Sequence, residues 1–192
     1  MLLDGLKIGF GLTGSFCTID SVFSQIEKLI SEGADVIPII SFSVDKYDTR
    51  FGKAEDIKSR LKSLTGKDAI ATIVDSEPIG PKNLLDIMVV APCTGNTLSK
   101  IANAITDTPV TMACKAHLRN NKPVVLSIST NDGLGGNARY IGQIINTKNM
   151  YLVPFGQDNP VSKPNSLVAK IDLILPTIQK AIEGKQIQPL LI

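Results

Sequence analysis

The sequence predicts a three-layer α/β domain in which a doubly wound parallel sheet lies between two layers of helices. Apolar, strand-like runs alternate with segments of helical periodicity along most of the 192 residues, a pattern that favours parallel strands joined by right-handed crossovers. The connections are short, and 43% of the residues are apolar, which suffices for one sizeable core but not for two. We therefore expect residues 1–192 to form a single Rossmann-like domain.

In the first half of the chain, apolar runs and helical spacing define the expected elements. Strands are predicted over residues 6–12, 35–41 and 70–74. Helices are predicted over residues 16–30 and 54–64, the first of them ended by Gly33. Pro38 removes one hydrogen-bond donor from the second strand, and the polar residues 45–50 predict a loop.

The second half of the chain continues the alternation. Strands are predicted over residues 86–91, 123–129 and 150–155. Helices are predicted over residues 98–105, 109–119 and 138–145. Two prolines predict a loop over residues 156–165, after which Ser166 is expected to cap a last helix that runs to Glu183 and is kinked at Pro176.

Composition argues against several classes of protein. The net charge of +2, with 5% aromatic residues and no tryptophan, argues against a nucleic-acid partner. No apolar run approaches the roughly 20 residues of a membrane span, and the first residues lack the pattern of a leader, so we expect a soluble, cytoplasmic protein. Cys17, Cys93 and Cys114 lack the spacing of a zinc site or a disulfide framework, and we expect buried thiols and no metal.

The stretch Ala91-Pro-Cys-Thr-Gly-Asn-Thr97, which joins a buried strand to a helix, predicts a binding site. Pro92 ends ladder pairing, Gly95 allows a close backbone approach, and Thr94 is placed to cap the helix. Hydroxyl, amide and backbone N–H groups at a helix start suit an anion or a polar ligand; a capped turn without a ligand is the alternative. Ligands of doubly wound sheets bind at the carboxyl ends of the strands. The loops that meet there are 11–15, 41–43, 91–97 and 130–137.

The first of these loops matches the dinucleotide pattern G-x-G-x-x-G as Gly9-Phe-Gly11-Leu-Thr-Gly14. A dinucleotide site also needs an acidic residue at the end of the second strand, but that strand ends at Ser41 and Ser43. Serine hydroxyls donate hydrogen bonds to anions, so the residues favour a mononucleotide whose phosphate contacts Ser15, Ser41 or Ser43. Ordinary strand-end and helix-cap bonding of these serines is the alternative.

The last of these loops, rich in glycine, predicts a carboxylate site. Its backbone donors and asparagines lie near a guanidinium fork, and the residues concerned are Asn131, Gly135, Asn137 and Arg139. A flexible loop with a solvated arginine is the alternative. The one histidine, His117, lies on a predicted helix face, where we expect a structural role at the surface or half-buried. No catalytic triad or carboxylate pair is evident, so the catalytic residues stay unknown.

Two motifs resemble a known family. Gly11-Leu-Thr-Gly-Ser15 and the stretch 91–98, followed by Lys100-Ile-Ala-Asn-Ala104 and Asp107, are similar to the flavoprotein fold of the homo-oligomeric FMN-containing cysteine decarboxylases and the flavin prenyltransferases. The resemblance covers residues 6 to about 160, and it implies self-association and an FMN pocket. It assigns that pocket to Gly11, Thr13, Gly14, Ser15, Ser41, Ser43, Pro92, Thr94, Asn96 and Thr97.

Within this family, the segments 11–18, 129–135 and 152–160 are similar to a subgroup that forms pyridine-2,6-dicarboxylate for endospores. This resemblance implies one component of an oxidoreductase, working with a dehydrogenase-like A subunit that carries NAD(P), in the cytoplasm of the mother cell of a sporulating bacterium. It also implies a small dicarboxylate substrate, a dihydrodipicolinate-type precursor, bound near Asn131 to Arg139.

The chain departs from the decarboxylases in two places. They carry a histidine before the proline-containing motif, which is absent here, and a Pro-Ala-Met-Asn substrate segment, of which Ser129-Thr-Asn131 keeps only the asparagine. These departures imply a different substrate. The alternatives are an FMN-dependent decarboxylase, a flavin prenyltransferase-like enzyme, and a non-catalytic scaffold for the A subunit.

Overall fold

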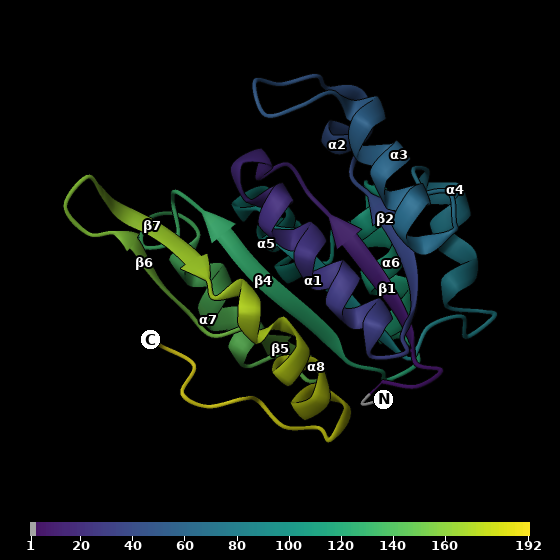
Figure 1. The fold of residues 1–192 in the computed structure, drawn as a ribbon. Helices are drawn as coiled ribbons and strands as arrows, with labels where there is room; N and C mark the ends of the chain where they lie inside the picture. Colours follow the sequence, from purple (N-terminus) through teal and green to yellow (C-terminus); the bar gives the residue numbers. More distant parts are fainter. Residues whose placement is uncertain (1–2) are drawn as a thin grey trace.

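The computed structural model describes residues 3–192 and contains the expected parallel sheet. Its parallel strands are β1 (Lys7–Leu12), β2 (Asp35–Ile40), β3 (Ile87–Cys93), β4 (Val124–Thr130) and β5 (Met150–Leu152). They lie in the order β2-β1-β3-β4-β5 (Figure 1). The chain reverses its direction of winding between β1 and β3, which creates a switch point there. The prediction of a doubly wound α/β fold is confirmed.

Helices cover both faces of the sheet (Figure 1). One face carries α1 (Ile19–Ser31) and α8 (Ile174–Ile182), and the other carries α5 (Gly95–Ala102), α6 (Pro109–Leu118) and α7 (Ala138–Ile145). The helix α3 (Ala54–Thr65) packs beside β2 and α1, next to the short helix α2 (Phe42–Lys46). No helix within residues 3–192 is long and apolar enough to cross a membrane.

The described chain also contains short 3-10 helices. They are η1 (Phe16–Thr18), η2 (Glu77–Ile79) and η3 (Ile171–Leu173). Gly33, with φ of 92°, follows α1 directly after its C-cap, as the sequence predicts. Residues 42–46 form a helix although the sequence predicts a loop from 45, because the turn that leaves β2 continues into one short helical segment.

The third predicted strand, over residues 70–74, is wrong. Only Ile70 pairs with the sheet, through a single bridge to Ile39, and the chain then enters the short helix α4 (Ile73–Ser76). Thr72 caps this helix, since its Oγ1 accepts a hydrogen bond from the N–H of Asp75 at 3.0 Å. Val74 is 79% exposed, so its β-branched side chain finds no core against which a strand would pack.

A hairpin replaces the predicted loop over residues 156–165. The strands β6 (Phe155–Asn159) and β7 (Lys163–Ala169) are antiparallel, and β7 also pairs with Ser129 and Thr130 at the end of β4. Ser166 is therefore a buried strand residue and does not cap a helix. The last helix begins only at Ile174, so Pro176 lies in its first turn, where its missing N–H breaks no intrahelical hydrogen bond.

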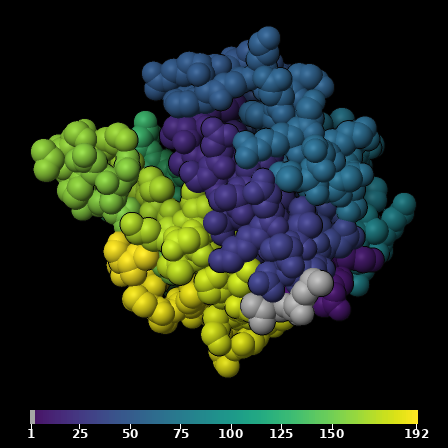
Figure 2. Space-filling view, in the orientation of Figure 1, coloured from purple at the N-terminus to yellow at the C-terminus, as the bar shows by residue number. Residues whose placement is uncertain are grey.

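The chain after α8 runs back along the hairpin. Phe155 donates its N–H to the carbonyl of Leu190 at 3.0 Å, and its own carbonyl accepts from the N–H of Ile192 at 3.1 Å. The base of β6 is thus hydrogen-bonded on its outer edge. In Figure 2 the tip of the hairpin, in light green, stands out at the left of the molecule, and the segment that follows β2, in blue, lies at the top.

Candidate functional site

A cleft of about 960 Å³ lies at the carboxyl edge of the sheet. It opens over the ends of β1, β3 and β4, beside the switch point, where ligands bind in open α/β sheets. Its lining includes predicted site residues from three of the expected loops, namely Gly14, Ser15, Thr94, Asn96, Asn131 and Asn137. The structure therefore brings together parts of the predicted cofactor and substrate sites in one cavity.

The floor of the cleft, formed by residues 14–15, 94–96 and 129–137, is held by hydroxyl groups. Thr13, which is 1% exposed, donates from Oγ1 to the carbonyl of Pro92 at 2.6 Å and accepts from the N–H of Thr94 at 3.0 Å. The hydroxyls of Ser15 and Ser129 lie 2.8 Å apart. These bonds join the ends of β1, β3 and β4, so Thr13 and Pro92 position the floor from below and do not line the cleft.

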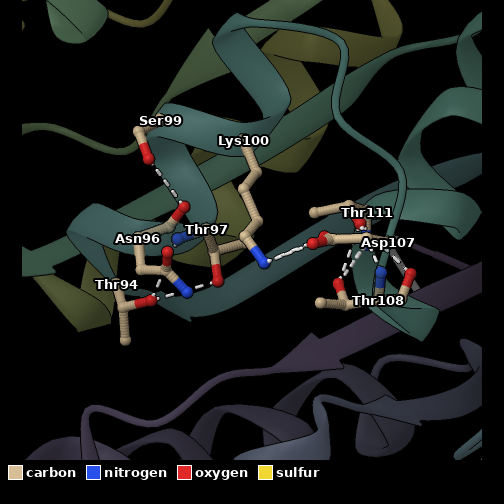
Figure 3. A network of polar contacts seen from close by, with 8 residues as sticks. All are labelled: Thr94, Asn96, Thr97, Ser99, Lys100, Asp107, Thr108 and Thr111. Carbon is tan, nitrogen blue, oxygen red and sulfur yellow. Dashed lines mark hydrogen bonds and ion pairs between the residues drawn. The ribbon is translucent and has the colours of Figure 1, made fainter.

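The start of α5 contributes Thr94 and Asn96 to the lining of the cleft, and Figure 3 shows the polar contacts of this segment. Thr94 caps the helix as predicted, because its Oγ1 accepts from the N–H of Thr97 at 3.2 Å; it also donates to the buried Thr97 hydroxyl at 3.0 Å. Farther along the helix, Lys100 pairs with Asp107 at 2.9 Å. The Asn96 amide has no hydrogen-bond partner within residues 3–192 and lies exposed at the cleft, so it is free to bind a ligand.

Gly95 belongs to the floor and allows the close backbone approach that the sequence predicts. A Cβ at this position would lie 2.5 Å from Nδ2 of Asn137 and 2.6 Å from Oγ1 of Thr130. The first turn of α5 therefore packs directly on the end of β4 and on the loop that follows it. Only glycine permits this contact without displacing those side chains.

The serines after β2 lie behind the first loop. The hydroxyls of Ser41 and Ser43 are 2.9 Å apart, and a Cβ on Gly14 would lie 2.9 Å from Oγ of Ser43. Gly14 thus separates this serine pair from the cleft, and neither serine lines it. Gly11 lies inside β1, where a Cβ would meet Met88 and Val110 at 3.0 Å, so its role is to let α6 approach the sheet.

The loop 131–137 is folded around Asp132. The Asp132 carboxylate accepts from the N–H of Gly136 at 3.1 Å and from Nδ2 of Asn137 at 3.3 Å. Gly135 lies against the same carboxylate and leaves no room for a Cβ. Arg139 donates from Nε to the carbonyl of Gly136 at 3.2 Å and does not line the cleft, so the structure does not bring it to the other predicted ligands.

The rim of the cleft, formed by Arg50, Phe51, Asp158 and Lys163, was missed by the sequence analysis. Arg50 and Phe51 follow α2, whereas Asp158 and Lys163 lie on the two strands of the hairpin. Lys163 pairs with Asp158 at 2.6 Å, and this hydrogen bond raises the pKa of the lysine. Both segments were predicted to be loops, so no sequence signal placed them beside the strand ends.

Two buried thiols and the histidine are excluded from the cleft. Burial, reinforced by the neighbouring Cys114 thiol, raises the pKa of Cys93, and burial raises the pKa of Cys114 to about 12. Both thiols are therefore protonated and unreactive at neutral pH. Cys17, expected to be buried, is instead exposed and lines the cleft.

His117 has a structural role, but it is buried and not at the surface or half-buried as the sequence predicts. It is 1% exposed, and its Nε2 donates to the carbonyl of Pro123 at 3.1 Å. Burial, followed by the charge of Lys122, lowers the pKa of His117 from 6.5 to about 4. Because Pro123 precedes β4, this histidine lies at the opposite edge of the sheet from the cleft.

Comparison with known proteins assigns the fold to a family. The model of the flavoprotein family matches residues 2–165. The chain belongs to the flavoprotein family. It is 55% identical over 190 residues to the B subunit of dipicolinate synthase of Bacillus subtilis (strain 168), a match that covers 99% of this chain and 95% of the relative. The expected resemblance to this family and to its dipicolinate-forming subgroup is thereby confirmed.

Solved structures agree with this assignment. The crystal structure of the dipicolinate synthase B subunit from Bacillus halodurans C has a TM-score of 0.92 and 50% identity, with 100% of this chain and 98% of that chain covered. The FMN-dependent cysteine decarboxylase SpaF has a TM-score of 0.67 over 95% of this chain and 98% of its own. At 14% identity, SpaF shares the fold alone.

Proposed function

We propose that the chain is the B subunit of a dipicolinate synthase, which forms pyridine-2,6-dicarboxylate from a dihydrodipicolinate-type precursor together with an A subunit. The observation that carries this proposal is the 55% identity to such a protein over 99% of the chain. The polar cleft at the carboxyl edge supports it, since a cavity of about 960 Å³ is large enough for a small substrate beside a cofactor.

The residues of the cleft fit a flavin mononucleotide. The Ser15 hydroxyl, the Asn96 amide and the backbone at Gly14 supply donors for phosphate and ring oxygens, and the first turn of the eight-residue helix α5 faces the same space. Phe16 adds an apolar surface to the lining. FMN, when bound there, would supply an electron acceptor or donor. Ser41 and Ser43 would support the first loop from behind Gly14.

In the proposed function, the residues of this chain bind and orient the substrate and the flavin. No histidine lines the cleft, and the Asp132 carboxylate is occupied by its loop, so neither provides an evident general base. We assign the redox step to the oxidoreductase formed with the A subunit, which carries NAD(P). The loops of this chain hold substrate and flavin and keep them oriented.

The setting of this function follows from the same proposal. We place the enzyme in the cytoplasm of the mother cell during sporulation, and we expect the chain to self-associate. Arg139, which lies outside the cleft, would then contact a neighbouring copy or solvent instead of the substrate.

The test is reconstitution with the A subunit. The purified chain, its dehydrogenase-like partner, the precursor and NAD(P) are combined, and pyridine-2,6-dicarboxylate is measured by mass spectrometry, with the chain omitted as the control. We expect product only in the complete mixture. Equal rates without the chain would show a scaffold, and turnover of peptidyl cysteine by the chain alone would show a decarboxylase.

The cofactor is tested separately. The visible absorbance of the purified chain, with the mass of any molecule released on denaturation, identifies a bound flavin. We expect FMN to be released, or to be taken up when it is added. A colourless chain that takes up no FMN would overturn the flavin assignment, and the place of the chain in dipicolinate synthase would then be decided by the reconstitution.

A further inference from the structure

Two cationic side chains line the cleft within residues 3–192, and they come from opposite sides of it. Arg50 follows α2, and Lys163 begins β7. In Figure 1 these segments lie on the two sides of the carboxyl edge of the sheet, beyond β2 and beyond β4. A ligand on the floor of the cleft is therefore approached by one positive charge from each side.

The Arg50 guanidinium is oriented but not neutralised. Its central carbon lies 4.8 Å from the centre of the Phe51 ring, in the geometry of a cation–π contact. No carboxylate within residues 3–192 pairs with it. A guanidinium held against an aromatic ring loses little further freedom when it binds a carboxylate through two parallel hydrogen bonds. Arg50 is thus ready to bind an anionic group.

The Lys163 ammonium has a partner that a ligand can replace. Its ion pair with Asp158 joins two exposed side chains across the hairpin, and such pairs contribute only about 0–1 kcal/mol. The other acid of the cleft, Asp132, has both oxygens engaged by its own loop. Asp158 is therefore the internal competitor for any carboxylate that approaches Lys163.

We propose that Arg50 and Lys163 bind the two carboxylates of a planar pyridine dicarboxylate, one from each side of the cleft, and that Asp158 yields Lys163 to the ligand. The inference rests on the proposed function and names the residues that select a diacid. It gives Arg50 the role that the sequence assigned to Arg139, which donates to its own loop outside the cleft.

The experiment compares a diacid with a monoacid. The chain, alone and with the A subunit, is titrated calorimetrically with pyridine-2,6-dicarboxylate and with pyridine-2-carboxylate. Arg50→Gln is expected to weaken diacid binding by about 10- to 100-fold, the size of a charge-assisted hydrogen-bonded contact. The preference for the diacid over the monoacid should shrink toward one. Lys53→Gln, with the same charge change at an exposed position outside the cleft, should change neither affinity.

For a second variant, the proposal predicts tighter diacid binding. Asp158→Asn removes the competitor for Lys163 and should tighten diacid binding up to about fivefold, an outcome that a merely structural role of the hairpin would not produce. Weaker binding in Asp158→Asn would overturn the competitor role.

Several outcomes would overturn the role of Arg50. These are unchanged diacid affinity in Arg50→Gln, absence of diacid binding by the wild-type chain with and without the A subunit, and loss of FMN affinity with diacid affinity retained. The last outcome would show that Arg50 binds the phosphate of the cofactor. Failure of the proposed function is distinguishable, because it would appear as absence of product in the wild-type reconstitution.

Discussion

The two edges of the parallel sheet carry polar residues of opposite kinds. At the amino edge, the polar groups that the fold brings together have partners in the chain: His117 donates to Pro123, the Lys122 ammonium donates to the carbonyl of Leu85 at 2.5 Å, and Asp86 accepts from the N–H of Lys7 at 2.9 Å. At the carboxyl edge, Arg50 lacks a carboxylate partner and the Asn96 amide lacks any hydrogen bond within residues 3–192.

This difference separates stability from function. A buried polar group costs free energy unless it is paired, so the pairing of His117 and Lys122 maintains the fold. Groups left unpaired at a cleft keep their bonding capacity for a ligand. Substitutions at the amino edge should therefore change stability alone, whereas substitutions at the carboxyl edge should change binding, with stability affected only where the floor is built.

The largest expected effect on stability concerns the amino edge. Burial lowers the pKa of His117 from 6.5 to about 4, so between these values the unfolded chain binds the proton more readily than the folded chain does. The contribution is fully present above pH 6.5 and is lost as the pH falls toward 4, by up to about 3 kcal/mol. Urea unfolding at a series of pH values measures it.

The control for this prediction is His117→Gln, which replaces the imidazole N–H with an amide N–H donor and does not titrate. The free energy of unfolding of the wild type minus that of the variant should decrease as the pH is lowered from 6.5 to 4. The contributions of the other titrating groups cancel in this difference. Ligand affinity at pH 7 should be unchanged. A parallel pH dependence of stability in both proteins would contradict the prediction.

The next effect concerns the floor of the cleft. Gly95→Ala adds a Cβ 2.5 Å from Asn137 and 2.6 Å from Thr130, which forces α5 away from the loop. The free energy of unfolding should decrease by about 1–3 kcal/mol, and ligand affinity should decrease as well. Gly142→Ala is the matched control: it lies inside α7 with open space around it, and it should stabilise the protein by about 0.5–1 kcal/mol. Thermal unfolding and titration compare the two.

A smaller loss is expected when the hydroxyl below the floor is removed. Thr13→Val keeps the side-chain shape but leaves the Pro92 carbonyl and the Thr94 N–H without this partner, at a cost of about 1–2 kcal/mol. Ser24→Ala, which removes an exposed hydroxyl bonded to Ser21 in α1, should cost less than about 0.5 kcal/mol. Equal losses in the two variants would show that the floor does not depend on Thr13.

The smallest effect on stability should be at Asn96. Asn96→Ala should change the free energy of unfolding by less than about 0.5 kcal/mol and weaken FMN binding about tenfold. Asn103→Ala, at the other end of α5, should lower stability and leave FMN binding unchanged. Its amide donates to the carbonyl of Ser99 at 2.7 Å and faces no cleft. Fluorescence titration with FMN, beside urea unfolding, distinguishes the two patterns.

The sequence predicted the central sheet because its signals are local. Buried strands such as β3 are continuous apolar runs, and Thr94 occupies a capping position that depends on the next three residues only. The prediction of a strand over residues 70–74 was wrong because an apolar β-branched run does not reveal whether a core lies beside it. Val74 faces solvent. The hairpin was not predicted, because its exposed strands carry prolines and polar residues that are typical of loops.

The site was predicted where it consists of strand-end loops and missed where it depends on tertiary contacts. Ser15, Thr94 and Asn96 follow strands directly, so the fold class alone brings them together. Arg50 and Lys163 are 113 positions apart in this numbering, and only the packing of the hairpin on β4 places Lys163 at the cleft. Arg139 lies close in sequence to the loop, but its side chain is held to the Gly136 carbonyl.

The segment that pairs with Phe155 has a consequence for solubility. An outer strand of a sheet presents unpaired N–H and C=O groups on which another chain can add a strand and start aggregation. Residues 190–192 occupy the groups of Phe155, and the carbonyl of Ile192 also lies against Gly156. The last residues described thus shield the edge of β6, and the same hairpin that presents charge to a ligand is protected from unwanted pairing at its base.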